Sequence, residues 1–376
     1  MKFVVSSMEL LSHLQAISRV ISNKNTLPIL DNFLFSLEGR TLEITASDLE
    51  STLITKLQLE NADGDGLIAI PARILTDTLK EFPDIPLTFN INLDSLMIVI
   101  QSENGKFTIM GQRGTEFPQM PQLREEQKQS VDMDAEVLMS GINRTLFATA
   151  DDELRPVMNG IFIELSPDDL TFVASDAHKL VRYKRMDAKA GKSSSFILPK
   201  KPASLLKNIL AKESNMVRLE FDEKNASFTL TSYRIVCRLV EGNYPSYNSV
   251  IPMDNPYKMT IDRLEFFNTL KRVSVFSNQA SNLVKLALTG NQLTISAQDI
   301  DFSISATERL NCQYEGEDME IGFKSTFLVE ILANIPSSEV VMEMSDPTRA
   351  GILLPAGSEN ESEDILMLLM PMMINA

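Results

Sequence analysis

The chain repeats one residue pattern three times, at a spacing too long for a solenoid. Residues 28–48 and 156–176 share a proline, alternating apolar residues and a Ser-Asp end (Ser47-Asp48, Ser175-Asp176), at an offset of 128 positions. A fainter third copy covers residues 284–299. Solenoid repeats span roughly 20–50 residues, whereas a period of this length matches a whole domain. The sequence therefore predicts one domain used three times, at residues 1–120, 130–250 and 255–376.

Each copy contains two helical patterns separated by strand-like runs. Apolar residues recur at helical spacing over residues 9–24, 71–82, 134–149, 199–213, 261–276 and 324–335. The runs between them largely alternate apolar with polar residues, which indicates strands covered on one face. The expected fold class is α+β, with two helices packed on an antiparallel sheet in each domain.

Charge is distributed unevenly between these helices and the rest of the chain. The whole chain has a formal net charge of −16. The six predicted helices hold 13 Lys+Arg against 9 Asp+Glu, whereas the rest holds 22 against 42. Helices at equivalent places in three domains should face the same way, and a shared axis would give them one positive lining. Such a lining would hold a phosphate backbone without reading its sequence. Ordinary solvated lysines are the alternative.

Domain size constrains how such a lining could form. A domain of ~120 residues has a diameter of roughly 35 Å. Three such bodies in a circle leave almost no hole, whereas six leave a hole of roughly 30 Å, wide enough for duplex DNA. Six domains require two chains, joined head to tail in a closed ring dimer.

No catalytic, metal-binding or cofactor-binding constellation can be assembled. Residues 190–193 resemble the end of a phosphate-binding loop, but its first glycine would fall at Met186. Residues 61–66 resemble the start of a calcium loop, but Ala72 stands where the glutamate is required, so a turn between strands is favoured. His13 lies in the first predicted helix and is expected at the surface. We expect no metal and no cofactor.

Cysteine usage and the lack of targeting segments favour the cytoplasm. Cys237 and Cys312 belong to no disulfide or metal-ligand framework, which fits a reducing compartment. The N-terminal segment lacks the apolar core of a signal peptide, and no apolar run is long enough to span a membrane.

Three loops carry residues beyond what the repeat needs. They are a turn at residues 174–180, a linker at 241–252 and the methionine-rich segment at 367–373. Loops often carry function, and methionine suits surfaces that accept several peptide shapes. The structural alternatives are a histidine without a role, a linker anchored by its aromatics, and core filling.

Five segments in register, 155–160, 174–180, 239–252, 319–323 and 370–372, resemble the bacterial sliding clamps, the β subunits of DNA polymerase III. The resemblance spans the whole chain. It implies a ring-shaped homodimer that encircles duplex DNA, tethers the replicative polymerase and has no catalytic activity of its own. It also implies a pocket for short linear motifs of polymerases, the clamp loader and repair proteins.

The resemblance also implies site residues. The peptide pocket would comprise Ser175, Ala177, His178, Lys179, Leu180, Pro245, Val250, Met370, Pro371 and Met372. DNA contacts would fall on Lys24, Arg73, Arg155, Lys200 and Lys201, and ring closure would pair Phe107 with Val275 and Phe276. The family often has Gly and Arg where this chain has Ala177 and Lys179, and the tail differs after Met372, so the peptide preference stays open.

Two other interpretations of the residues stay open at this point. One is a scaffold of three similar domains that binds peptides without DNA, and the other is an enzyme whose site the sequence does not reveal.

Overall fold

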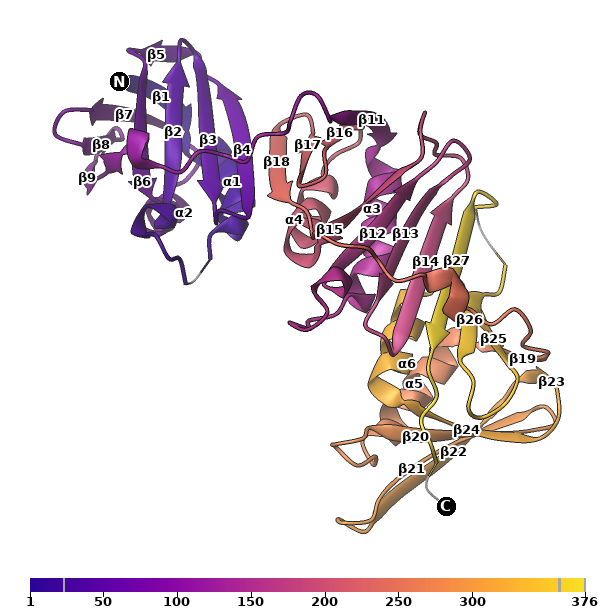
Figure 1. Ribbon diagram of the computed structural model, residues 1–376. Coiled ribbons are helices and arrows are strands. Elements are labelled where there is room, and N and C mark those ends of the chain that lie inside the picture. The colour runs from indigo at the N-terminus through magenta and orange to yellow at the C-terminus, as the bar shows by residue number, and fades with distance from the viewer. Residues whose placement is uncertain (23, 358–359, 375–376) are drawn as a thin grey trace. The chain divides into compact units, whose positions relative to one another are not determined.

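The computed structural model describes residues 1–22, 24–357 and 360–374 (Figure 1). The chain separates into two compact units, residues 1–139 with 201–239 and residues 140–200 with 240–376. Each unit holds one nine-stranded sheet and one smaller sheet, built of antiparallel pairs. The α+β class is confirmed.

Six α-helices lie within the described residues, one at each predicted position. They are α1 (Ser7–Ile17), α2 (Ala72–Lys80), α3 (Ala135–Thr145), α4 (Lys200–Leu210), α5 (Arg263–Ser274) and α6 (Ser325–Asn334). The predicted ranges extend past the C-terminal end of every helix, most at α1 and α3, where Ser18–Val20 and Leu146–Ala148 tighten into 3₁₀ turns.

The first unit contains a five-stranded and a nine-stranded sheet. The five-stranded sheet has the order β5 (Asn61–Asp63), β1 (Lys2–Ser6), β7 (Pro86–Asn92), β8 (Met97–Gln101) and β9 (Lys106–Met110). The nine-stranded sheet has the order β10 (Gln112–Arg113), β6 (Gly66–Pro71), β2 (Asn32–Glu38), β3 (Thr41–Ser47), β4 (Ser51–Gln58), β18 (Tyr233–Arg238), β17 (Asn225–Thr229), β16 (Met216–Phe221) and β11 (Gln129–Asp134). In the core of the first unit, the ring of Phe3 stacks on those of Phe35 and Phe89.

The second unit contains a nine-stranded and a four-stranded sheet. The nine-stranded sheet has the order β15 (Ser194–Pro199), β12 (Gly160–Leu165), β13 (Leu170–Ser175), β14 (Lys179–Arg185), β27 (Glu363–Leu369), β26 (Gly351–Pro355), β25 (Glu339–Met344), β19 (Tyr257–Asp262) and β23 (Gln313–Glu315). The four-stranded sheet has the order β22 (Ile304–Asn311), β21 (Gln292–Asp299), β20 (Leu283–Thr289) and β24 (Met319–Lys324).

Each nine-stranded sheet is joined in the same way. In the first, β4 pairs with β18, and Thr52 lies opposite Val236. In the second, β14 pairs with β27, and Leu180 lies opposite Leu368 (Figure 1). At each junction, the last strand in the first half of one repeat pairs with the last strand in the second half of the next repeat. This continuity explains why the chain divides into two units, and the three domain limits stay a prediction.

The repeated Ser-Asp pair closes a hairpin turn. Asp48 Oδ1 accepts hydrogen bonds from the amides of Glu50 and Ser51, and Asp176 Oδ1 accepts from those of His178 and Lys179. The turn residue after each aspartate is left-handed, with φ of 78° at Leu49 and 74° at Ala177. The offset of 128 therefore preserves a turn geometry.

His13 lies half-buried against the junction, not at the open surface as expected. Its Nδ1 lies 2.5 Å from Thr55 Oγ1, and its ring stacks at 5.5 Å on Tyr233. Burial lowers the pKa of His13, although the nearby Glu9 opposes the shift. The prediction failed because the apolar pattern marked the neighbouring helix positions and gave no sign that β18 would pair beside β4.

Candidate partner-binding and nucleic-acid sites

The structure brings together the three loops that the sequence singled out. The Met370 amide donates to the His178 carbonyl at 2.8 Å, which ties the C-terminal tail to the turn after β13. Leu180 shares a hydrophobic cluster with Leu368 and with Tyr247 of the linker. Turn, linker and tail therefore meet beside the pairing of β14 with β27.

The linker is held by its two tyrosines. Tyr244 stacks on Phe162 with ring centroids 4.8 Å apart, and the Tyr247 hydroxyl donates to Glu164. Burial raises the pKa of Tyr247, and the Glu164 carboxylate reinforces the shift. The tyrosines are therefore anchors, as the structural alternative supposed.

Pro245 and Val250, the predicted pocket residues of this linker, remain exposed, Val250 at 56%. The sequence missed Phe162 as the ring on which the linker rests. The repeat gave no signal for this contact, because the equivalent position in the first copy is Leu34, which has no ring.

The tail runs along β24 after leaving β27. The Met372 amide donates to the Gly322 carbonyl at 2.8 Å. A Cβ at Gly322 would lie 2.7 Å from the Met372 carbonyl oxygen, so only glycine allows this approach. Met370 is 41% exposed, and Pro371 and Met372 are partly exposed.

Lys179 is not a free cation at this surface. Its side chain is 5% exposed, and Nζ lies 2.7 Å from Asp176 and 3.1 Å from Glu330. The ammonium also lies 4.2 Å from the centre of the Phe327 ring, on which the exposed His178 stacks at 5.9 Å. Lys179 therefore links the turn to α6, whereas His178 faces solvent.

The five cations predicted to contact DNA are accessible, and four of them have a carboxylate partner among the described residues. Lys24 is exposed, and the side chains of Arg73, Arg155, Lys200 and Lys201 are each at least 40% exposed. The partners are Asp77 for Arg73, Asp152 for Arg155, Asp151 for Lys200 and Asp48 for Lys201.

Two of these pairs share one polar pocket in the second unit. The pocket has a volume of about 370 Å³ and includes Arg155, Lys200, Asp151 and Asp152 in its lining. The hydrogen bond from Arg155 lowers the pKa of Asp152, because it stabilises the ionised carboxylate. The pocket also includes Lys179, so its three cations are each paired with a carboxylate.

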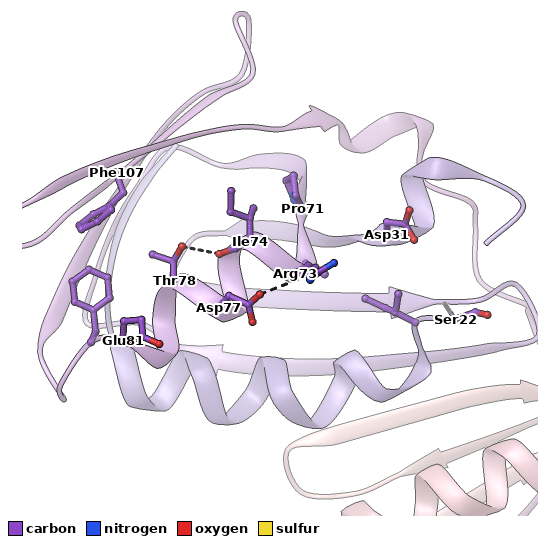
Figure 2. Close-up of a pocket in the computed structure, with 12 residues that line it drawn as sticks. Ser22, Asp31, Pro71, Arg73, Ile74, Asp77, Thr78, Glu81 and Phe107 are labelled. Carbon is purple, nitrogen blue, oxygen red and sulfur yellow. Dashed lines mark hydrogen bonds and ion pairs between the residues drawn. The ribbon is translucent and has the colours of Figure 1, made fainter. Parts of the chain in front are cut away.

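Phe107 lies at a groove of about 1000 Å³ in the first unit, lined also by Arg73, Ile74 and Phe82 (Figure 2). Phe107 packs edge-on against Phe82 at 5.3 Å and is 39% exposed. Ile74 is 53% exposed. Arg73, assigned to DNA by resemblance, thus lies in the same groove as the residue assigned to ring closure.

The strands β9 and β22 are exposed where their repeat equivalents are buried. The strand registers make Phe107 of β9 the repeat equivalent of Ile235 in β18 and of Met367 in β27. Both Ile235 and Met367 are 0% exposed. The first five residues of β4 are all buried, whereas those of β22 are exposed or partly exposed. Each of the two strands lies at the end of its sheet.

Large apolar side chains surround the exposed end of β22. Val275 and Phe276, at the end of α5, are 73% and 37% exposed. Ile300 and Phe302, in the turn before β22, are 80% and 74% exposed and were missed by the sequence interpretation. The sequence did contain a signal for this exposed apolar surface, because two bulky apolar residues stand in an otherwise polar and acidic turn.

Two negative findings concern metal ligands and membrane-spanning helices in the part of the chain that the structure describes. No group of three or more His, Cys, Asp or Glu side chains there could hold a metal ion. Among the described helices, none has both the length and the apolar character needed to cross a bilayer.

Comparison with known proteins gives one family over the whole chain. Residues 1–121, 132–246 and 248–373 match the N-terminal, central and C-terminal domain models of the DNA polymerase III beta subunit. A beta sliding clamp of Pseudomonas putida is 29% identical over 366 residues, covering 96% of this chain and 98% of the relative.

Solved structures give the same result. A sliding clamp from Pseudomonas aeruginosa, 26% identical, covers both chains fully with a TM-score of 0.93. One from Bartonella birtlesii, 28% identical, covers both chains fully with a TM-score of 0.91. The chain therefore belongs to the DNA polymerase III beta subunit family, the bacterial sliding clamps.

Proposed function

We propose that two copies of this chain close head to tail into a ring around duplex DNA. The ring tethers the replicative polymerase, and it has no chemistry of its own. Its place of action is the cytoplasm, where replication would require it. The observation that carries the proposal is the exposure of β9 and β22, the strands whose equivalents are buried at both junctions within the chain.

The two exposed strands are the pair that a third junction needs. Within the chain, β4 joins β18 and β14 joins β27. By repeat position, β22 corresponds to β4 and β14, and β9 corresponds to β18 and β27. Pairing β22 with β9 of a second copy would join a four-stranded and a five-stranded sheet. The result is a third nine-stranded sheet, and two such contacts close the ring.

The repeat also gives the register of this contact. Thr52, Leu180 and Ser305 each lie opposite the residue before the turn aspartate. Thr52 and Leu180 pair with Val236 and Leu368, which correspond to Thr108 on β9. Ser305 of one copy should therefore lie opposite Thr108 of the other, with Phe107 facing the helices.

A cysteine pair tests both the contact and its register. Residues directly opposite in an antiparallel pair have Cα atoms about 4.5–5.5 Å apart, within disulfide range. The variant Thr108→Cys, Ser305→Cys should form a covalent dimer under mild oxidation. The native Cys237 and Cys312 are buried and should not interfere.

The control variant, Thr108→Cys with Ala306→Cys, places the second thiol on the other face of the strand and should remain uncrosslinked. Light scattering should meanwhile give the unmodified protein twice the 42.0 kDa mass of one chain. A monomer at micromolar concentration, or equal crosslinking of both variants, would contradict the proposal.

The surface where turn, linker and tail meet is proposed as the docking site for partners. Its exposed or partly exposed members combine apolar and adaptable side chains: Ala177, His178, Pro245, Val250, Met370, Pro371 and Met372. An extended peptide with aliphatic or aromatic anchors suits such a surface. The partners would be the replicative polymerase, other polymerases, the clamp loader and repair proteins, each through a short linear motif. Lys24, Arg73, Arg155, Lys200 and Lys201 would contact the DNA backbone.

A further inference from the structure

The cations proposed to contact DNA in the second unit each carry a neighbouring carboxylate. Lys200 Nζ lies 2.5 Å from Asp151 Oδ2, and Arg155 Nε lies 2.8 Å from Asp152 Oδ2. Asp151 is 81% exposed by side chain, so solvent and solutes reach this pair freely. The four groups belong to one pocket, which also includes Lys179 with its partners Asp176 and Glu330. Its carboxylates therefore match or exceed its cations, and it offers no excess of positive charge.

The first unit shows the same arrangement. Lys201 pairs with Asp48 and also donates to the Val20 carbonyl at 2.9 Å. Arg73 Nε lies 3.8 Å from Asp77 (Figure 2). Asp77 also holds Lys80 at 3.0 Å. A pattern that recurs at four of the five predicted DNA-contacting cations is more than a single chance pair.

A paired cation binds phosphate differently from a free one. Phosphate must first displace the carboxylate, and the released carboxylate then repels the phosphate backbone. Exposed ion pairs are held weakly, so the exchange is possible, but it subtracts from the affinity. It also reduces the net release of counterions, which otherwise gives a slope of about −0.9 per phosphate in log affinity against log salt.

We propose that Asp151 and Asp152 restrain DNA binding by competing with backbone phosphates for Lys200 and Arg155. This inference rests on the proposed function, because it assumes that DNA lies against these cations. It assigns the two aspartates a role of their own: they keep the grip on DNA weak enough for the ring to move along the duplex. Their removal should strengthen binding and slow that movement.

The test measures binding of the full-length dimer to a fluorescein-labelled duplex of about 30 base pairs at several salt concentrations. The variant Asp151→Asn, Asp152→Asn should bind about tenfold more tightly at low salt, with a salt slope steeper by about 1–2. Asn keeps the turn hydrogen bond that Asp152 Oδ1 accepts from the Leu154 amide. Should the double variant fold poorly, the exposed Asp151→Asn alone provides the same test.

A matched control separates local competition from a general loss of negative charge. Asp346 and Arg349 have the same spacing as Asp152 and Arg155, with Nε 3.4 Å from Oδ2 and the Thr348 amide bonded to Oδ1. Asp346→Asn should change affinity less than twofold. The gain from Asp151→Asn should also disappear in a Lys200→Ala background, as a local pair requires.

The outcomes are distinct. Unchanged or weaker binding by the aspartate variants, or an equal gain from Asp346→Asn, would overturn the competition. If Lys200→Ala and Arg155→Ala leave binding of the unmodified protein unchanged, the assignment of DNA to these cations is itself wrong. Weaker binding by the cation variants together with a gain by the aspartate variants would support both proposals.

Discussion

Gly322→Ala should detach the C-terminal tail without altering the tail sequence. The added Cβ would lie 2.7 Å from the Met372 carbonyl oxygen, 2.9 Å from Leu283 Cδ1 and 3.0 Å from Ile374 Cγ1. The side-chain atoms can shift, but the backbone oxygen cannot move away while the Met372 amide keeps its 2.8 Å bond to the Gly322 carbonyl. The tail must therefore leave β24.

The loss of stability caused by Gly322→Ala can be estimated from the contacts that the tail gives up. One backbone hydrogen bond contributes about 0.5–1.5 kcal/mol net, so the free energy of unfolding should fall by about 1 kcal/mol. β27 stays paired with β14 and β26, so the fold should survive. If Met370 and Met372 form part of the docking site, their displacement should weaken partner-peptide binding about tenfold, since that corresponds to about 1.4 kcal/mol.

The assay is fluorescence anisotropy with a labelled peptide that carries the polymerase's clamp-binding motif, together with chemical denaturation. Gly191→Ala is the control, because a Cβ there meets nothing within 4 Å. Deletion of residues 370–376 should abolish peptide binding and leave the dimer intact. Peptide affinity within twofold of the unmodified protein, for a Gly322→Ala variant that shows the expected loss of stability, would place the docking site elsewhere.

Three further predictions follow from single positions. Phe107→Ala should weaken the dimer by about 2–4 kcal/mol, as expected for an aromatic interface anchor, and sedimentation should show dissociation at micromolar concentration. Ala177→Gly should raise the free energy of unfolding by about 0.5 kcal/mol, because relief of the φ of 74° outweighs the added freedom of the unfolded chain; a loss of stability by denaturation would contradict this. Burial lowers the pKa of His13 below its value of 6.5 in the unfolded chain. As the pH falls, the unfolded state therefore binds this proton before the folded state does. The free energy of unfolding should be highest above pH 6.5 and should fall as the pH drops from there to the folded pKa. Denaturation across this range should show the decline in the unmodified protein and lose it in His13→Gln.

Much of the fold was predictable because the repeat made each element visible more than once. The helices followed from apolar spacing, and the turn at Asp176 followed from its counterpart at Asp48. The pairing of β4 with β18 was not predictable, because nothing in either strand specifies a partner about 180 residues away. The burial of His13 depends on that pairing and was missed with it.

The candidate sites were predictable as residues but not as contacts. The motifs identified Lys179 and Gly322, yet the burial of the lysine beside Phe327 and the approach of the tail to the glycine need three-dimensional packing. Likewise, counting charges found the basic helices but not the carboxylates beside Lys200 and Arg155. Such pairing depends on side-chain distances that sequence spacing does not specify.

In the proposed assembly, DNA passes through a closed ring of two chains. The most direct measurement loads labelled protein onto nicked circular DNA with a clamp loader and follows retention before and after the circle is cut. We expect stable retention on the circle and rapid loss over the free ends of the linear DNA. Retention that is unchanged after linearisation would show ordinary surface binding and would contradict the account.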